Sequence, residues 1–536
     1  MGTGSHQATG GPGPTRVWSG RDPRVQGAWC PRRVDQSTDP ERHFPVATSR
    51  YAIRTELSDT GQAALAPSRA DRLPEARSKL TPVSGASAVP ERLPSQHSDA
   101  EPEAASDPTS PSGQLGEPQL ALRTLWGLAT RIYSGARTMM SDPRVRGVLR
   151  AGPRVGLFLL RGHRRTASAG EDDTVVPVRP TPLLALQAYL DEVMIAVSRH
   201  PDLLPRPADY APAAEDLAGI GDLFSKRGWL ERPTEYHRKP PMPDDLHASH
   251  GHAAGLGYEH ITFTSGWEPD PEEPGRSRWL SHEANRTVHA LVSRTPGREH
   301  PSWLICAHGF GMGTNAFMDL RAFRTQQLHR LGINVVVPVL PLHGPRASGR
   351  VRGEDLMTID LVDSMHGMAQ ATWDLRRIIR WVRESQGAQT VGLIGYSLGG
   401  LVAALVAATE DDLACVIAGV PVVDLPGLFR RHSPPDIAKL ADSYGVLGQA
   451  ADDTHRVVSP LAMECKVPFE HRYVFSGLAD RMSTFGQARR LWLHWGQPPL
   501  ATYRGGHVGF FFSSVVRKFV DEALKSSFAT AYGIQG

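Results

Sequence analysis

Ser397 is the residue of this sequence best placed to act as a nucleophile. It lies between the apolar run 391–394, which predicts a buried strand, and the Ala/Leu-rich run 398–408, which predicts a helix. Gly395 and Gly399 stand two residues before and two residues after it, as a strained strand-to-helix turn requires. Such a turn exposes the hydroxyl at the positive end of the helix, where a developing anion is stabilised. The alternative interpretation is a helix-capping serine in a tight turn.

Two further residues could activate that hydroxyl. A serine is a weak nucleophile unless a base removes its proton, and a carboxylate helps the base by stabilising its charged form. Asp480 ends the predicted strand segment 471–480, and His507 follows the next predicted strand, directly after two glycines. The chain order is therefore Ser397, Asp480, His507, with the acid and the base at separate strand ends. The alternatives are a solvated loop aspartate, a structural histidine, and Asp424 as the acid.

Hydrolysis also needs N–H groups directed at the oxyanion that forms. One is the backbone N–H of Leu398, directly after the nucleophile. We expect the second from the loop 308–313 (HGFGMG), where Phe310 is the candidate donor, unless this loop is simply a flexible turn. A second His-Gly loop, 341–346 (PLHGPR), is expected to form a wall of the site. Its Arg346 could bind a substrate carboxylate or phosphate, or pair with an acid of the protein itself.

Predicted strands and helices alternate from residue 302 onward. The expected helices, besides the one after Ser397, are 317–331, 361–384, 485–495 and 515–524. Alternation of this kind predicts an α/β architecture, with a mostly parallel sheet covered by helices on both faces. Ligands bind at the carboxyl ends of such strands, where the candidate nucleophile, acid and base all fall. The insertion 424–465 carries apolar residues and is placed to act as a cap over the site.

The segment 229–301 is expected to open the hydrolytic domain, which we assign to 229–536. A proline-rich connector comes first, and the alternating runs 258–265 and 288–294 predict antiparallel strands at the edge of the sheet. The connector contains acids and histidines that could suggest a metal site, namely Asp244, Asp245, His247, His250 and His252. Their spacing matches no standard ligand motif, so a solvated loop is expected and no metal is predicted.

The N-terminal part of the chain has a different composition. Residues 1–117 are rich in Pro, Ser, Gly, Arg and Ala with no sustained periodicity, which predicts a disordered extension. Residues 118–228 are expected to form a helical region, with helices near 183–197 and 214–223. Its basic amphipathic part, 120–160, could make a peripheral contact with an anionic membrane surface or pack on its own domain.

Length and composition exclude some classes of protein. The chain has 536 residues and a formal net charge of +3, which gives no general argument for nucleic-acid binding. Its four cysteines (Cys30, Cys306, Cys415, Cys465) show no metal-ligand spacing and look like thiols of a reducing compartment. The N-terminus has no secretory pattern, and no run approaches ~20 apolar residues. These features predict a cytoplasmic protein, with membrane association through the basic segment left open.

Residues 255–530 resemble the α/β-hydrolase-fold serine hydrolases. The motifs HGFGMG, PLHGPR, GYSLGG, GLAD and GGH stand where that family has its oxyanion loop, nucleophile, acid and base. Within the fold, PLHGPR and the long N-terminal extension are similar to the abhydrolase-domain proteins rather than to lipases or peroxidases. The resemblance implies a sheet of about eight strands, an esterase-like mechanism in two steps, and no metal or organic cofactor. Residues 1–250 lie outside it.

The expected activity is cleavage of a small-molecule carboxylic ester through an acyl-enzyme, with Ser397, Asp480 and His507 as catalytic residues. Apolar residues in the cap segment favour an apolar acyl group. Two alternatives stay open. An acyltransferase would pass the same acyl group to an alcohol or amine, and a binding protein would keep the fold without catalysis.

Overall fold

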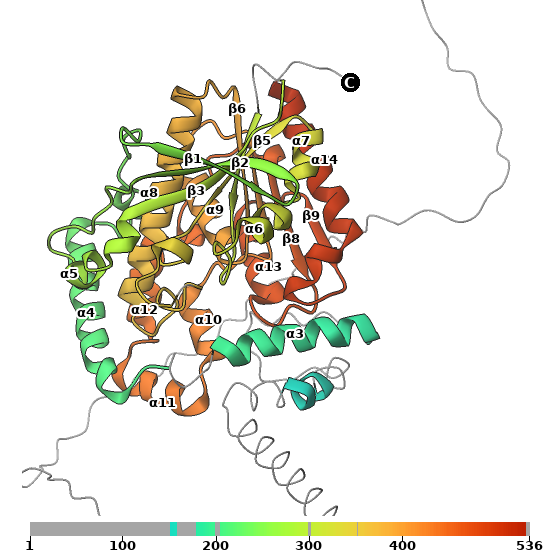
Figure 1. The fold of residues 1–536 in the computed structure, drawn as a ribbon. Coiled ribbons are helices and arrows are strands. Elements are labelled where there is room, and N and C mark those ends of the chain that lie inside the picture. The colour runs from blue at the N-terminus through green and yellow to red at the C-terminus, as the bar shows by residue number, and fades with distance from the viewer. Residues whose placement is uncertain (1–150, 158–177, 199–203, 298–301, 351, 532–536) are drawn as a thin grey trace, which may run out of the picture. The chain divides into compact units, whose positions relative to one another are not determined.

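The computed structural model describes residues 151–157, 178–198, 204–297, 302–350 and 352–531 (Figure 1). They are built around a nine-stranded sheet with the order β1-β2-β3-β5-β4-β6-β7-β8-β9. The strands are β1 (His247–Ala253), β2 (Leu256–Thr264), β3 (Thr287–Ser293), β4 (Ser302–Ala307), β5 (Ile333–Pro338), β6 (Thr390–Tyr396), β7 (Cys415–Gly419), β8 (Arg472–Gly477) and β9 (Leu500–Tyr503). β1, β2, β3 and β5 pair antiparallel in that order, whereas β5, β4 and β6 to β9 pair parallel. The carboxyl ends of the parallel strands therefore share one edge of the sheet.

Strand β4 shows how the sheet separates two hydrophobic cores. All six of its residues are buried, and successive side chains point to opposite faces. Trp303 and Ile305 join the core shared with α4, α8, α9 and α13, while Leu304 and Cys306 join the core shared with α6, α7 and α14. The sheet thus has helices on both faces, and the predicted α/β architecture is confirmed.

The helices follow the predicted alternation. They are α3 (Pro182–Ser198), α4 (Tyr210–Arg227), α5 (Arg276–Leu280), α6 (Ala316–Ala322), α7 (Thr325–Arg330), α8 (Leu361–Glu384), α9 (Leu398–Thr409), α10 (Leu425–His432), α11 (Pro435–Tyr444), α12 (Gln449–Thr454), α13 (Thr484–His494) and α14 (Ser514–Ala531). Helix α8 has the predicted bounds. The single helix predicted at 317–331 is wrong, because Arg324 adopts a left-handed backbone with φ 55° and divides the segment into α6 and α7.

Strand β1 corrects two sequence-based expectations. The sheet has nine strands rather than about eight, and part of the expected connector loop is an edge strand, whose His247 pairs with Thr262 of β2. Its sequence, HASHGHA, contains no β-branched residue, so it carries no strand signal of its own. The strand is stabilised by its pairing with β2. The two strands are joined by the two-residue turn Ala254-Gly255, in which both residues have positive φ.

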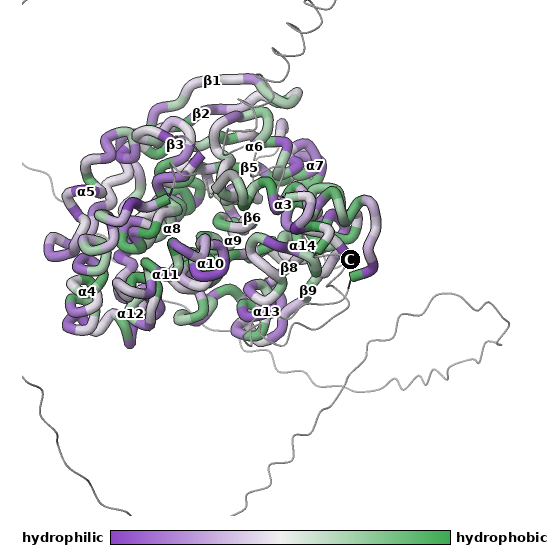
Figure 2. The backbone as a smooth tube through the Cα atoms, turned by 90° about the horizontal axis from the view of Figure 1, so that it is seen from below, coloured by the Kyte–Doolittle hydropathy of each residue, from purple (hydrophilic) through white to green (hydrophobic). Residues whose placement is uncertain are grey.

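Helices that precede the sheet and helices of the insertion 424–465 pack against the α/β domain and against each other. Helix α4 packs on α8 and on α12, so the helical segment around it contributes to the main core. Helices α10, α11 and α12 occupy the insertion 424–465. Figure 1 places α3, α10 and α11 at the lower end of the sheet, and Figure 2 shows the molecule from that end. No described helix is long and apolar enough to cross a membrane.

Several expectations concern residues outside those that the structure describes. They are the disordered extension 1–117, Cys30, and most of the basic segment 120–160. Of that segment the structure describes residues 151–157, which are helical. Cys306, Cys415 and Cys465 are free thiols, as predicted, and burial raises the pKa of each.

Candidate active site

Ser397 occupies the turn between β6 and α9. Its backbone has φ 56° and ψ −114°, a conformation that residues with a side chain rarely adopt. The flanking glycines are required by space, because a Cβ at Gly395 would lie 1.9 Å from the carbonyl oxygen of Gly399. A Cβ at Gly399 would lie 2.0 Å from the carbonyl oxygen of Ala307. The turn therefore has the strained strand-to-helix geometry of a nucleophile elbow, with the serine at the amino end of α9.

Asp480 and His507 lie in hydrogen-bond contact, as the chain order predicted. Nδ1 of His507 is 2.7 Å from Oδ2 of Asp480, and both side chains are buried. The other carboxylate oxygen of Asp480 accepts the backbone N–H groups of Met482 and Ser483, at 2.8 and 3.1 Å. The carboxylate is thus held in a fixed orientation toward the imidazole. With Nδ1 donating to it, the lone pair of His507 lies on Nε2, the nitrogen that a general base would use.

The charge environment of His507 favours its protonated form. Burial lowers the pKa of the imidazole, but the charge of Asp480, its hydrogen bond and the charge of Asp191 raise it, and the net shift is upward. A base of this kind is neutral at alkaline pH and gains a proton more readily than a free histidine. It can therefore accept the proton of a serine as that serine attacks.

The two predicted oxyanion donors lie beside the nucleophile. A Cβ on Gly309 would be 3.5 Å from Cβ of Ser397, which places the loop 308–313 against the elbow. Phe310, Ser397 and Leu398 line one cavity. Within the described residues, neither the Phe310 N–H nor the Leu398 N–H donates a hydrogen bond. Both groups are therefore available for a developing oxyanion.

The cavity in front of Ser397 is apolar. Its volume is about 160 Å³, and most of its wall is contributed by aliphatic, aromatic and methionine side chains. Helix α10 of the insertion supplies Leu428 and Phe429, α11 supplies Ile437, and α3 supplies Met194 and Ile195. The insertion 424–465 thus covers the site in the position expected of a cap. Such a wall suits a hydrocarbon group rather than a charged one.

Asp424, the competing acid, has other partners. It caps α10 by accepting the N–H of Gly427 at 2.8 Å, and it pairs with Arg490 at 2.8 Å. It lines a second, larger cavity of about 410 Å³ that includes neither Ser397 nor the oxyanion loop. Polar side chains such as Arg430 and Asp452 contribute to its wall and pair with each other. The apolar cavity, despite its smaller size, is therefore the candidate site.

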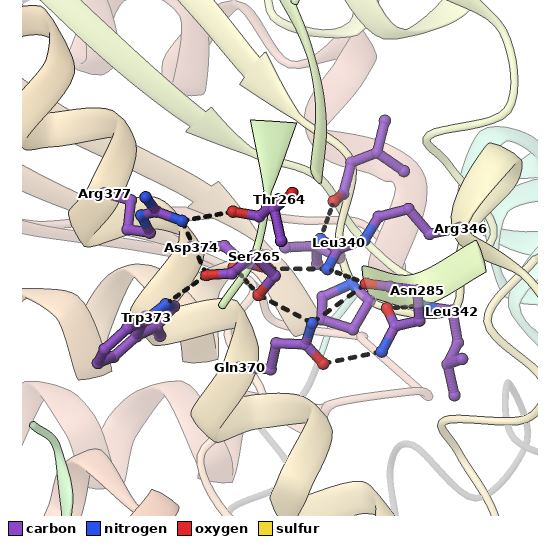
Figure 3. A network of polar contacts seen from close by, with 12 residues as sticks. Thr264, Ser265, Asn285, Leu340, Leu342, Arg346, Gln370, Trp373, Asp374 and Arg377 are labelled. Carbon is purple, nitrogen blue, oxygen red and sulfur yellow. Dashed lines mark hydrogen bonds and ion pairs between the residues drawn. The ribbon is translucent and has the colours of Figure 1, made fainter. Parts of the chain in front are cut away.

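Arg346 is a structural residue, in agreement with the second of its two interpretations. Its guanidinium is fully buried and pairs with Asp374 of α8 at 2.8 Å. It also donates to the carbonyl oxygens of Val339 and Asn285. Figure 3 shows this network, in which the Ser265 hydroxyl donates to the same Asp374 carboxylate. The network joins the loop 341–346 to α8 behind the site, so Arg346 does not face a substrate.

Sequence reasoning missed one hydroxyl next to the acid and the base. Ser483 lies 3.1 Å from Oδ2 of Asp480 and 3.3 Å from Nδ1 of His507, and it also donates to the carbonyl oxygen of Val420. It lines the apolar cavity together with Ser397. It therefore joins the acid–base pair to the cavity in which the nucleophile lies. Its position three residues after Asp480 was the available signal.

Helix α3 was also missed as part of the site. Asp191 accepts the backbone N–H of His507 at 2.8 Å, and Gln187 accepts that of Gly506 at 3.1 Å. The sequence predicted this helix but gave no sign that it contacts the base. As for metals, no cluster of three or more His, Cys, Asp or Glu side chains suited to an ion occurs among the described residues.

Comparisons with known proteins agree with this architecture. The family model described as the alpha/beta hydrolase family matches residues 304–525. Two curated uncharacterized proteins of Mycobacterium tuberculosis, from strains CDC 1551 / Oshkosh and ATCC 25618 / H37Rv, are each 38% identical to this chain over 391 residues. Each match covers 72% of this chain and 93% of the relative.

Solved structures resemble the chain more distantly. Acetyl xylan esterase 1 from Thermoanaerobacterium sp. JW/SL YS485 is 13% identical and has a TM-score of 0.39, with 57% of this chain and 93% of that chain covered. An acylaminoacyl peptidase of Pyrococcus horikoshii is 14% identical and has a TM-score of 0.33, with 54% and 42% covered. The match to the family model, together with the largely parallel sheet and the strand-turn-helix serine, places this chain in the alpha/beta hydrolase family.

Proposed function

We propose that the protein is a serine hydrolase that cleaves a carboxylic ester with an apolar acyl group through an acyl-enzyme intermediate. The observation that carries the proposal is the position of Ser397. It lies on a strained elbow, in an apolar cavity, next to two N–H groups that have no other acceptor within the described residues. A binding protein has no need of that combination.

The proposed mechanism has two steps. Ser397 attacks the acyl carbon while Nε2 of His507 takes its proton, and the N–H groups of Phe310 and Leu398 stabilise the oxyanion. His507, charged and hydrogen-bonded to Asp480, then protonates the departing alcohol. In the second step, a water that gives its proton to His507 releases the carboxylic acid and restores the serine.

The proposal is tested by hydrolysis of p-nitrophenyl esters of increasing acyl length. We expect an optimum in acyl length, because the cavity is apolar and bounded, and loss of turnover in Ser397→Ala. Leu428→Trp would fill part of the cavity and move the optimum to shorter acyl groups. Leu493→Trp is the matched control, because this exposed residue of α13 lies outside the cavity wall, and its optimum should not move.

Two results would contradict the proposal. Equal rates for all acyl lengths in the wild type and in Leu428→Trp would mean that the cavity does not hold the acyl group. A higher yield of a new ester than of free acid, when an alcohol is added, would favour an acyltransferase that uses the same triad.

A further inference from the structure

Helix α3 contacts the two loops that carry the acid and the base, although it lies outside the segment 304–525. Oδ2 of Asp191 accepts the N–H of His507 at 2.8 Å and the N–H of Arg481 at 3.2 Å. One carboxylate oxygen thus joins the loop after β9 to the loop after β8. Oε1 of Gln187, one turn earlier on the same helix, accepts the N–H of Gly506 at 3.1 Å.

The buried face of α3 combines apolar side chains, such as Leu184 and Ile195, with three polar ones. Gln187, Asp191 and Glu192 are buried, whereas Leu183 and Leu186 are more than half exposed. The buried acids are the unusual feature, because acids of a surface helix ordinarily face water. Burying polar groups costs free energy unless they are hydrogen-bonded. The backbone N–H groups of the two loops supply hydrogen bonds to this face.

The glycines of the base loop let the side chains of α3 approach its backbone closely. A Cβ at Gly506 would lie 2.7 Å from Oδ2 of Asp191, and a Cβ at Gly505 would lie 2.3 Å from Oε1 of Gln187. Gly506 has φ −78°, a value open to any residue, so its backbone conformation does not explain the glycine. Close packing against α3 does.

The groups that face His507 come from several elements. Asp480 and Ser483 follow β8, Asp191 lies on α3, and the hydroxyl of Tyr503 from β9 donates to the carbonyl oxygens of Gly506 and His507. The nearby guanidinium of Arg481 is bound to Glu192, which also lies 3.6 Å from the guanidinium of Arg154. The carboxylates whose charges act on the imidazole are therefore those of Asp480 and Asp191. The charge of Glu192 is offset by the two guanidinium groups that it contacts.

The carboxylate of Asp191 is not satisfied by its neighbours alone. Its Oδ1 is buried and has no hydrogen-bond partner among the described residues. Burial, and then the charge of Asp480, raise the pKa of Asp191 to about 6, while the charge of His507 and the backbone N–H groups of His507 and Arg481 lower it. A buried carboxylate of this kind is most stable when His507 is protonated.

We propose that Asp191 is a positioning residue for the base, which holds the His507 loop through its main chain and favours the imidazolium that forms when Ser397 attacks. This inference rests on the proposed function. It extends the active site beyond the Ser-Asp-His triad to a carboxylate on a helix that precedes the sheet. Asp191 touches no reacting atom, so its effect on catalysis passes through His507.

The test combines the pH dependence of kcat/KM with a histidine-ring NMR titration of the full chain. Asp191→Asn keeps an acceptor oxygen and the shape of the side chain but removes the charge. We expect the His507 titration, and the acid limb of the pH profile, to move to lower pH. Gly506→Ala should displace the Asp191 carboxylate, move the titration in the same direction and lower kcat on the order of 10-fold with KM little changed.

Glu192→Gln is the matched control on the same helix. It removes a neighbouring buried carboxylate that pairs with Arg481, and its His507 titration should stay at the wild-type pH. Unchanged titration in folded Asp191→Asn and Gly506→Ala variants, or an equal shift in Glu192→Gln, would overturn the inference. The NMR shift needs no substrate, so a protein that cleaves no ester but shows the shift would refute the proposed function and leave the positioning role intact.

Discussion

At the scale of single residues, His507 is held at one ring nitrogen and at both polar groups of its backbone. Asp480 binds Nδ1, Asp191 binds the backbone N–H, and Tyr503 donates to the backbone carbonyl. A base held in this way loses little orientation when it changes charge, which is what a proton shuttle between serine and leaving group requires. Two buried carboxylates near one imidazole carry an energetic cost, however.

That cost predicts how stability depends on pH. The pKa of Asp191 is near its ordinary value of 3.8 in the unfolded chain, but burial and the charge of Asp480 raise it to about 6 in the fold. Between these two pH values the folded protein binds more protons at Asp191 than the unfolded chain does. The contribution of Asp191 to the free energy of unfolding therefore falls as the pH rises from about 4 to about 6. Asp191→Asn removes this loss.

We therefore expect the free energy of unfolding of Asp191→Asn, relative to wild type, to increase from about pH 4 to about pH 6. Urea unfolding at several pH values measures the difference. A difference between the two proteins that is constant over this range would show that Asp191 titrates normally in the fold.

At the scale of elements, the elbow between β6 and α9 stores backbone strain at the nucleophile. The strain persists because the turn is enclosed, with Gly395 against Gly399 and Gly399 against Ala307. An alanine at position 399 would favour the helix by about 1 kcal/mol on propensity alone, but its Cβ would meet a carbonyl oxygen at 2.0 Å. The clash is the larger effect.

Gly399→Ala should therefore lower the free energy of unfolding by about 1–3 kcal/mol and abolish most of the proposed esterase activity. Gly257→Ala on β2 is the control, because its Cβ would meet nothing within 4 Å. Thermal unfolding and turnover of both variants test the expectation. A fully active Gly399→Ala would show that the elbow can relax without harm to the nucleophile.

The network around Arg346 links the elements behind the site. Its guanidinium and Asp374 are both buried, so removal of one partner leaves the other charge without compensation. Arg346→Met should lower the free energy of unfolding by about 3–5 kcal/mol. A second variant, Arg346→Met combined with Asp374→Leu, should lose less than the sum of the two single changes, as a double-mutant cycle by urea unfolding would measure. Additive losses would mean that the pair is not coupled.

At the scale of the whole molecule, much of the fold was predictable because its signals are local. The alternation of short apolar runs with amphipathic segments gave the parallel sheet and the two layers of helices, and α8 has the bounds that its pattern predicted. Candidates for the nucleophile, the acid and the base could be named because each follows a parallel strand, and the carboxyl ends of these strands lie at the same end of the sheet.

What could not be predicted depends on contacts between distant parts of the chain. The strand β1 has no strand-forming residues and exists through its pairing with β2. Asp191 stands in a helix that the sequence predicted near 183–197, and the structure buries this acid against loops more than 280 residues away. No periodicity within the helix identifies such a partner. The mycobacterial matches cover 72% of this chain, which is longer than the segment before α3 or the segment after it. The matched segment therefore includes at least part of α3.

The most direct measurement of the central claim is labelling of the full chain by a fluorophosphonate, with the modified residue identified by peptide mass spectrometry. The account predicts a single phosphonylated residue, Ser397, with no labelling in Ser397→Ala and strongly reduced labelling in His507→Ala. Labelling at another residue, or none in a folded wild-type protein, would contradict it and favour a binding protein that keeps the fold without the chemistry.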